Sequence, residues 1–198
     1  MRVTSIIFGW FAATTIALAQ TMPTELFSVG GITINSSSFD DVQSVFGTAK
    51  RTRVDQTQHS DESICYQASG LKGPVSIQFL TGPLGGWRLV TGFQLTAGSN
   101  NKCSVTRVQL SKINVGGVEL GFTKQKIATL LRRPDISKRS NWSFEETYQR
   151  ELHDTEKAAF KSEIEAGKIV KLNVVDSVRL KFSESKLQSI MVQRLASY

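Results

Sequence analysis

The chain of 198 residues is poor in the residue types from which active sites are built. It has two cysteines and two histidines, no Cys-x-x-Cys pair and no Gly-x-Ser-x-Gly motif. Zinc centres need clustered ligands, and a serine or cysteine nucleophile needs a base beside it. The glycine pairs at 30–31, 85–86 and 116–117 lack the spacing and the lysine of a phosphate-binding loop. We therefore expect a protein without metal or cofactor, and not an enzyme.

The residues that remain as candidates for catalysis are scattered. His59 lies in a polar stretch and His153 in a charge-rich one, where a solvated side chain is the simpler interpretation. Glu145 and Glu146 are adjacent carboxylates, but neighbours on a strand point to opposite faces. A hydrolase that uses scattered carboxylates stays open as an alternative, and it requires two carboxylates in one cleft, about 5–10 Å apart.

Long apolar runs are scarce as well. The one extended run, residues 6–18, follows Arg2 and leads into Ala17-Leu18-Ala19, which is typical of a signal peptide cleaved after Ala19. A membrane anchor is the alternative, but two threonines interrupt a run already short for about 30 Å of hydrocarbon. No cysteine follows the run, which excludes bacterial lipid attachment there. We expect residues 1–19 to be removed, and the mature protein to be periplasmic or secreted and not membrane-spanning.

The first half of the mature chain has no excess of positive or negative charge, whereas the second half has an excess of positive charge. Lys and Arg number 6 and Asp and Glu number 6 in residues 20–105, against 17 and 11 in residues 106–198. In an exported protein this excess does not point to nucleic acid. A solvated surface of mixed charge is the plain interpretation, and attraction to an anionic envelope surface or to an acidic protein partner is the alternative.

Cys65 and Cys103 are the only cysteines, and an even number in an exported chain favours a disulfide. A reactive thiol or a metal pair needs further ligands or bases, which the sequence does not supply nearby. We therefore predict that the two cysteines are bonded to each other.

One short pattern occurs twice in the sequence. Gly31-Ile32-Thr33-Ile34 and a helical segment from Ser38 to Phe46 are echoed by Gly117-Val118-Glu119-Leu120 and a segment from Thr123 to Leu131. Matching positions lie 85 residues apart in the helical segments, namely Ser38 and Thr123, Val42 and Ile127, Val45 and Leu130, Phe46 and Leu131. Such a repeat predicts two similar units. We expect each helix to bury these apolar residues and Phe39 against its own sheet.

The rest of the chain reads mainly as strands. Alternating apolar and polar residues predict strands at 64–68, 75–80, 87–96, 105–110, 142–148, 174–182 and 187–195. The charge-rich stretch 151–168 is predicted to be a helical insertion, which either covers a sheet edge or docks a partner. The fold class is therefore α+β, with two tandem units at 20–105 and 106–198, each a short helix on an antiparallel sheet. Residues 105–110 belong to either unit or bridge both.

Gly121-Phe122-Thr123, followed by Leu130-Leu131 and Pro134, resembles the opening motif of the SmpA/OmlA (BamE-like) family of bacterial envelope proteins. That family commonly has glycine two residues before the proline, where this chain has Arg132; the first copy keeps Gly47. Tandem units of this kind also resemble the beta-lactamase inhibitor protein-like fold, whose two units form a concave protein-binding sheet. The resemblance implies helix-plus-sheet units. No role in outer-membrane assembly follows, because the lipid-acceptor cysteine of BamE homologues is missing.

Exposed aromatic side chains are the remaining candidates for binding. Trp87, Trp142, Phe144 and Tyr148 lie nearest to predicted loops or strand edges. Tryptophan and tyrosine are enriched in binding hot spots, although core packing is the alternative for each of the four. The sequence thus favours an exported non-enzymatic protein-binding or inhibitor-like module of the bacterial envelope. A structural envelope component is a further alternative to the hydrolase.

Overall fold

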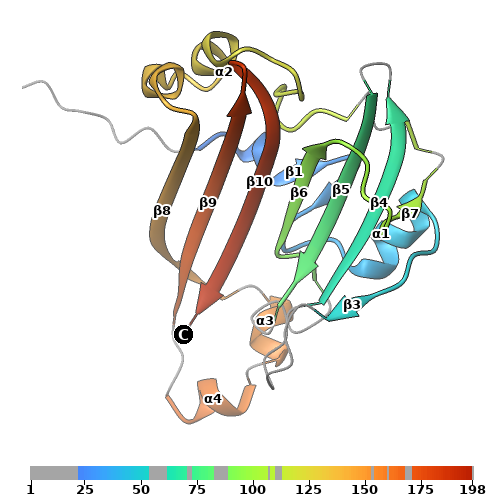
Figure 1. The fold of residues 1–198 in the computed structure, drawn as a ribbon. Helices are drawn as coiled ribbons and strands as arrows, with labels where there is room; N and C mark the ends of the chain where they lie inside the picture. Colours follow the sequence, from blue (N-terminus) through green and yellow to red (C-terminus); the bar gives the residue numbers. More distant parts are fainter. Residues whose placement is uncertain are drawn as a thin grey trace, which may run out of the picture.

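The computed structural model describes residues 22–53, 62–70, 73–82, 89–106, 108–109, 113–152, 154–159, 161–167 and 171–197. The predicted signal peptide, His59, Trp87 and His153 lie outside these ranges. The fold is α+β and mostly antiparallel (Figure 1). Its elements are η1 (Thr24–Phe27), β1 (Ser28–Val29), β2 (Ile32–Thr33), α1 (Phe39–Phe46), β3 (Thr52–Arg53), β4 (Glu62–Gly70), β5 (Gly73–Thr81), β6 (Gly92–Ala97), β7 (Ser104–Val105), α2 (Lys124–Leu130), η4 (Pro134–Lys138), β8 (Asn141–Glu151), α3 (Asp154–Ala159), α4 (Lys161–Glu165), β9 (Lys171–Ser183) and β10 (Lys186–Ser197).

One large sheet runs through the molecule in the order β3-β4-β5-β6-β10-β9-β8, with β7 paired to β4 (Figure 1). The first half of the chain supplies the antiparallel run β4-β5-β6, and the second half supplies β8-β9-β10. The two runs meet where Gly92–Thr96 of β6 pairs with Ser189–Gln193 of β10. The two sheets expected from the sequence are therefore joined edge to edge into one.

Helices α1 and α2 begin in the same way. The side chains of Ser38 and Thr123 accept hydrogen bonds from the backbone N–H three residues on, which caps each helix. Each capping residue also forms an isolated bridge to the sheet. Ser38 pairs with Leu89, shortly before β6, and Thr123 pairs with Lys186, the first residue of β10. Both helices are thereby held against the same side of the sheet, which we call the helix-side face.

At the end of α2, Arg132 takes the backbone conformation for which glycine is usual. Arg132 has a φ of +53°, in the left-handed region that glycine prefers. Its N–H donates to the Thr129 carbonyl, and the Arg133 N–H donates to the Ala128 carbonyl. These two bonds are the Schellman ending of a helix. The chain therefore makes the glycine-type turn with a residue that is strained in it.

The core lies on the helix-side face of the sheet. Phe39, Val42 and Phe46 of α1, with Ile127 of α2 and Leu131 just after it, are buried against alternate strand residues such as Phe79 and Ile190. Val45 and Leu130, also predicted to be buried, are 43% and 45% exposed. At 100° per residue they fall at the margin of the apolar stripe, so that prediction was wrong for both.

Two further sequence predictions are met in part by the described residues. Within the strand predicted at 105–110, Val105 belongs to β7, which pairs in parallel with Tyr66 and Gln67 of β4. Within the predicted helical insertion, residues 154–159 form α3 and residues 161–165 form α4. Ile164 of α4 packs with Tyr148 against a second small core of Leu152, Leu172, Val174 and Ala196. The insertion thus covers the end of the helix-side face.

Candidate functional site on the open face of the sheet

The side of the large sheet opposite α1 and α2 is polar. Because side chains alternate along a strand, each strand that buries apolar residues on one face presents its other residues on the second face. We call this second face the open face. Its central residues are Cys65 and Gln67 of β4, Ser76 and Gln78 of β5, Gln94 and Thr96 of β6, Ser189 and Met191 of β10, Ser177, Arg179 and Lys181 of β9, and Ser143 and Glu145 of β8.

The cross-strand register places these side chains in rows. One row runs through Cys65, Gln78, Gln94, Met191, Arg179 and Ser143, and a second through Gln67, Ser76, Thr96, Ser189, Lys181 and Asn141. The rows cross from the first half of the chain to the second at β6 and β10. The open face is therefore one surface, built by both halves.

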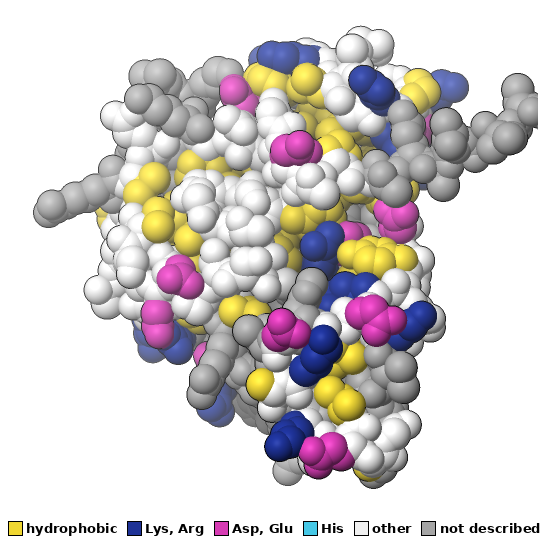
Figure 2. Space-filling model, turned by 180° about the vertical axis from the view of Figure 1, so that it is seen from behind, with side chains coloured by type: hydrophobic (Ala, Val, Ile, Leu, Met, Phe, Trp, Pro, Cys, Tyr) yellow, Lys and Arg dark blue, Asp and Glu magenta, His cyan; other side chains and the backbone are white. Residues whose placement is uncertain are grey.

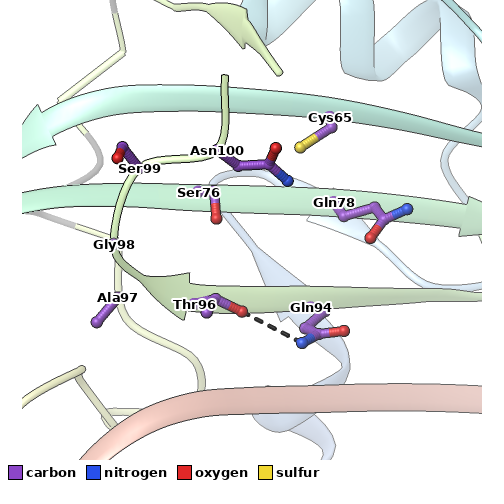
Figure 3. Close-up of a pocket in the computed structure, with 9 residues that line it drawn as sticks. All are labelled: Cys65, Ser76, Gln78, Gln94, Thr96, Ala97, Gly98, Ser99 and Asn100. Atoms are coloured by element: carbon purple, nitrogen blue, oxygen red, sulfur yellow. Dashed lines mark hydrogen bonds between the residues drawn. The ribbon is translucent and has the colours of Figure 1, made fainter. Parts of the chain in front are cut away.

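A first cleft of about 290 Å³ lies over β4, β5 and β6 (Figure 3). Ser76, Gln78, Gln94 and Thr96 line it from the strands. Residues 98–100 form its wall, because the chain leaves β6 at Ala97 and turns over β5 towards β4 (Figure 3). The Gln94 Nε2 donates to the hydroxyls of Thr96 and Ser189, at 3.2 Å each. The cleft is thus a small polar depression with an ordered network beneath it.

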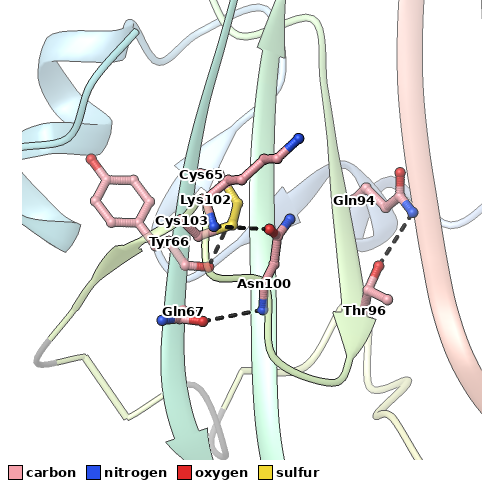
Figure 4. The surroundings of a disulfide bond; sticks show 8 residues. All are labelled: Cys65, Tyr66, Gln67, Gln94, Thr96, Asn100, Lys102 and Cys103. Carbon is pink, nitrogen blue, oxygen red and sulfur yellow. Dashed lines mark hydrogen bonds between the residues drawn. A yellow bond between two sulfur atoms is a disulfide. The ribbon is translucent and has the colours of Figure 1, made fainter. Parts of the chain in front are cut away.

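A disulfide between Cys65 and Cys103 fixes this wall, as the cysteine count predicts, with the two Cα atoms 4.7 Å apart (Figure 4). Cys65 projects from the open face of β4, and the wall passes above it. Two hydrogen bonds from backbone N–H groups support the crossing: Gly98 N–H donates to the Pro74 carbonyl at 2.8 Å, and Asn100 N–H donates to the side-chain Oε1 of Gln67 at 3.1 Å. The disulfide therefore shapes the rim of the open face as well as stabilising the fold.

A second cleft of about 490 Å³ lies over β8, β9, β10 and the edge of β6. Gln94 lines this cleft as well as the first, so the two are neighbours on one surface. Met191 forms an apolar patch in it, and Arg179, Lys181 and Glu145 supply its charges. Arg179, Lys181 and Glu145 are exposed, and Glu145 is the one carboxylate among the described residues that line either cleft. This surface can donate and accept hydrogen bonds and attract an anionic group.

Two of the predicted aromatic residues, Trp142 and Phe144, contribute to the lining of the second cleft, but their side chains do not point into the open face. Trp142, Phe144 and Tyr148 are all on β8, at positions whose side chains share the helix-side face. Trp142 is buried in the core, and its Nε1 donates to Asp135 Oδ2 at 2.5 Å. Phe144 stacks on Trp142 and packs under the Arg133 guanidinium, 4.5 Å from the ring centroid. Their side chains are thus held in packing on the side opposite the open face.

The carboxylates of the second half also come together on the helix-side face. Glu146 lies across from Asp176, which is only 5% exposed and accepts two hydrogen bonds of 2.6 Å from Arg194. The Asp176 hydrogen bond raises the pKa of Arg194, and burial raises the pKa of Tyr148, whose hydroxyl donates to Asp176 at 3.4 Å. The carboxylate of Asp176 is therefore held by Arg194 and Tyr148 in a structural contact.

Positive charge is concentrated at the α2 end of the molecule. Residues 113–140 contain six Lys and Arg against two Asp and Glu, and residues 179–186 contain three against one. Figure 2, which views the molecule from behind, shows some of these Lys and Arg side chains at the top, and others lower on the same face, where Asp and Glu lie among them. These two segments together carry +6, which equals the excess of the whole second half. The charged residues Arg179 and Lys181 of the open face belong to this basic end.

Comparisons with known proteins found no matching family, no matching curated protein and no matching solved structure. Within the described ranges, no helix is both long and apolar enough to cross a membrane. The same residues contain no group of three or more His, Cys, Asp or Glu side chains arranged to hold a metal ion.

Proposed function

We propose that this chain is an exported, non-enzymatic protein-binding module of the inhibitor-like type, and that it binds its partner through the open face of the sheet. The observation that carries the proposal is the contrast between the two faces of the same strands. One face is filled by helices, whereas the other presents polar and charged side chains in continuous rows from β4 to β8.

The shape of the face favours a protein over a small molecule. Ligand pockets are concave, mostly apolar and enclose most of the ligand. The two clefts here are open to solvent rather than enclosed, and Gln94 joins them into one extended surface. A wide surface with polar side chains around a patch such as Met191 is typical of a protein interface.

Charge complementarity favours a partner that presents an acidic loop. Arg179 and Lys181 stand in the second cleft with Glu145 as its single carboxylate, and the neighbouring basic end extends the positive potential. An acidic loop seated over β9 and β10 could form charge-assisted hydrogen bonds with both basic side chains. The long-range field of the basic end would also increase the rate of encounter with such a partner. Attachment to an anionic envelope surface uses the same field, and the capture experiment below separates the two.

We also propose that residues 20–105 and 106–198 are two copies of one unit, related to the BamE-like motif noted above. In support, the capping residues Ser38 and Thr123, 85 positions apart, make equivalent bridges to the sheet. Val29 pairs with Ile32 and Val115 with Val118 around Gly-Gly turns of similar positive φ. Each half then continues with three antiparallel strands. In this proposal the open face is a joint product of the two copies.

The hydrolase alternative has less support. It needs two carboxylates that converge in a cleft, with one free to act as acid or base. Glu146 and Asp176 are cross-strand neighbours, but Arg194 holds both oxygens of Asp176. Neither residue lines the clefts of the open face.

The proposal is tested by affinity capture from an envelope extract with the mature protein and with the double variant Arg179→Glu/Lys181→Glu. The matched control is Lys157→Glu/Lys161→Glu, which makes the same change in charge on α3 and α4, away from the open face. We expect a saturable protein partner to be retained by the wild type and the control, and lost by the open-face variant. The partner's binding segment should be acidic.

Three outcomes would contradict the proposal. Equal capture by all three proteins would place the binding site elsewhere. Binding to anionic lipid vesicles without a protein partner would favour a structural attachment to the envelope. Turnover of a small substrate that is lost in Glu146→Gln would favour the hydrolase.

A further inference from the structure

Strand β8 forms one edge of the large sheet and is long for an edge strand. It pairs with β9 over all of its 11 residues, Asn141–Glu151, without a register shift. It contains no proline, and no described strand lies on its other side. A long, regular edge of this kind is a template for pairing with another strand.

The outward-facing backbone groups of β8 can be identified. The Phe182 N–H donates to the Ser140 carbonyl, and these residues continue the β8–β9 register. In an antiparallel pair such directly bonded residues alternate with unbonded ones, so the even-numbered residues of β8 bond to β9. The N–H and C=O groups of the odd-numbered residues therefore point outward. These residues are Asn141, Ser143, Glu145, Thr147, Gln149 and Glu151, and the side chains of all six are exposed.

An apolar row on the open face leads to the middle of this edge. Leu195 of β10 lies beside Val175 of β9, which lies beside Thr147 of β8. Leu195 is 43% exposed, and it is one of the few large apolar side chains left exposed among the described residues. The row therefore ends at an unpaired edge, where a matching row would extend it.

We propose that a second copy of this chain pairs with β8, strand to strand and antiparallel, about a twofold axis that passes through Thr147. This register joins residues 143–151 of the two copies and forms about ten backbone hydrogen bonds. The axis places Thr147 against the partner's Thr147, so the row of Leu195, Val175 and Thr147 continues into its own copy. The two large sheets become one.

Side-chain pairing selects this register. On the helix-side face, Glu146 lies opposite the partner's Tyr148, and Phe144 lies opposite the partner's Arg150. On the open face, Glu145 lies opposite the partner's Gln149. No two like charges are directly opposed. An axis through Glu146 would oppose the two copies of Glu146, and an axis through Tyr148 would oppose Glu145 to the partner's Glu151, both of which are destabilising.

The first test is the mass of the mature protein in solution, by light scattering after gel filtration across a dilution series. We expect twice the mass of one chain, falling to the single mass on dilution. Thr147→Pro removes an N–H that faces away from β9, so it should leave the fold intact, as judged by circular dichroism, and give a monomer. Thr147→Ala keeps the N–H and should remain a dimer. A wild-type monomer throughout the series would overturn the proposal.

The second test fixes the register by oxidative cross-linking of single added cysteines. Thr147→Cys should form an intermolecular disulfide, because the axis brings its two copies together. Glu145→Cys should not, because its copies lie four residues apart along the strands. Cross-linking of Glu145→Cys in preference to Thr147→Cys would overturn the proposed axis. A dimer that persists in Thr147→Pro would show that another surface associates. Neither test involves Arg179 or Lys181, so failure here leaves the open-face proposal standing.

Discussion

The two faces of the large sheet are made by the same strands but differ in what covers them. On the helix-side face, Ile77, Phe79 and Ile190 are buried in the core beneath α1 and α2. On the open face, the residues one position along the strands, such as Gln78 and Met191, are partly exposed and line the clefts. If the proposed function is right, the alternation of side chains along each strand separates stability on one face from recognition on the other. Substitutions on the two faces should therefore have different effects.

The largest expected effect is in the core beneath the two helices. Phe46 packs against Tyr66 and Phe79 with ring centroids 5.4 and 5.2 Å apart, and Leu131 is buried at the equivalent place in the second half. Phe46→Ala and Leu131→Ala should each lower the free energy of unfolding by about 2–5 kcal/mol, since neither site can refill the lost volume. Urea denaturation measures this. Val45→Ala and Leu130→Ala are the matched controls, because both side chains are half exposed, and equal losses at all four would contradict the assignment of the core.

Loss of the disulfide is expected to lower the free energy of unfolding by a similar amount. Cys65 and Cys103 close a loop with a sequence separation of 38. In the chain-entropy relation, replacing both with serine should lower the free energy of unfolding by about 4 kcal/mol. The same change should free the wall formed by residues 98–100, and so weaken partner binding in excess of the loss of folded protein. Unchanged stability and binding in the double variant would show that the disulfide neither stabilises the fold nor shapes the binding surface.

A stabilising effect is expected at the end of α2. Arg132 is exposed and has a φ of +53°, whereas the matching position of the repeat, 85 residues earlier, is Gly47. Arg132→Gly relieves the strain of a side chain in the left-handed region, and should raise the free energy of unfolding by about 1 kcal/mol. Arg132→Ala, which removes the charge but keeps the strain, is the control. A gain in the alanine variant equal to that in the glycine variant would attribute the effect to charge.

The smallest effect on stability is expected on the open face. Arg179→Ala and Lys181→Ala remove exposed side chains from the second cleft. Each should change the free energy of unfolding by less than about 0.5 kcal/mol. A loss of several kcal/mol would mean that these residues support the fold, and the proposed separation between the faces would fail.

Much of the fold could be predicted from the sequence, because it depends on local patterns. The caps at Ser38 and Thr123 and the hairpin of β9 and β10 follow from capping residues, turn residues and alternation. The pairing of the cysteines followed from their number. Helix margins were less predictable: Val45 and Leu130 are apolar, but only the neighbouring elements decide whether a residue at the margin is covered.

The candidate site could not be predicted in the same way. The open face depends on the pairing of β6 with β10, which lie almost 100 residues apart in the chain, and no local pattern specifies such a contact. Their size and aromatic character predicted a binding role for Trp142 and Phe144, but the side chains of both pack on the opposite face. The available signal was the polar half of each alternating strand, including Ser76 and Gln78, which on its own means only exposure to solvent.

The central claim, that the open face is the binding surface, is tested most directly by blocking its middle. Gln94 lines both clefts, and its Nε2 donates hydrogen bonds of 3.2 Å to the hydroxyls of Thr96 and Ser189. Gln94→Trp places a bulky ring between the two clefts and should lower the free energy of unfolding by no more than about 1 kcal/mol. We predict that calorimetry with the captured partner will show binding weakened at least about tenfold, a change of about 1.4 kcal/mol. Unchanged affinity in a folded Gln94→Trp variant would contradict the account.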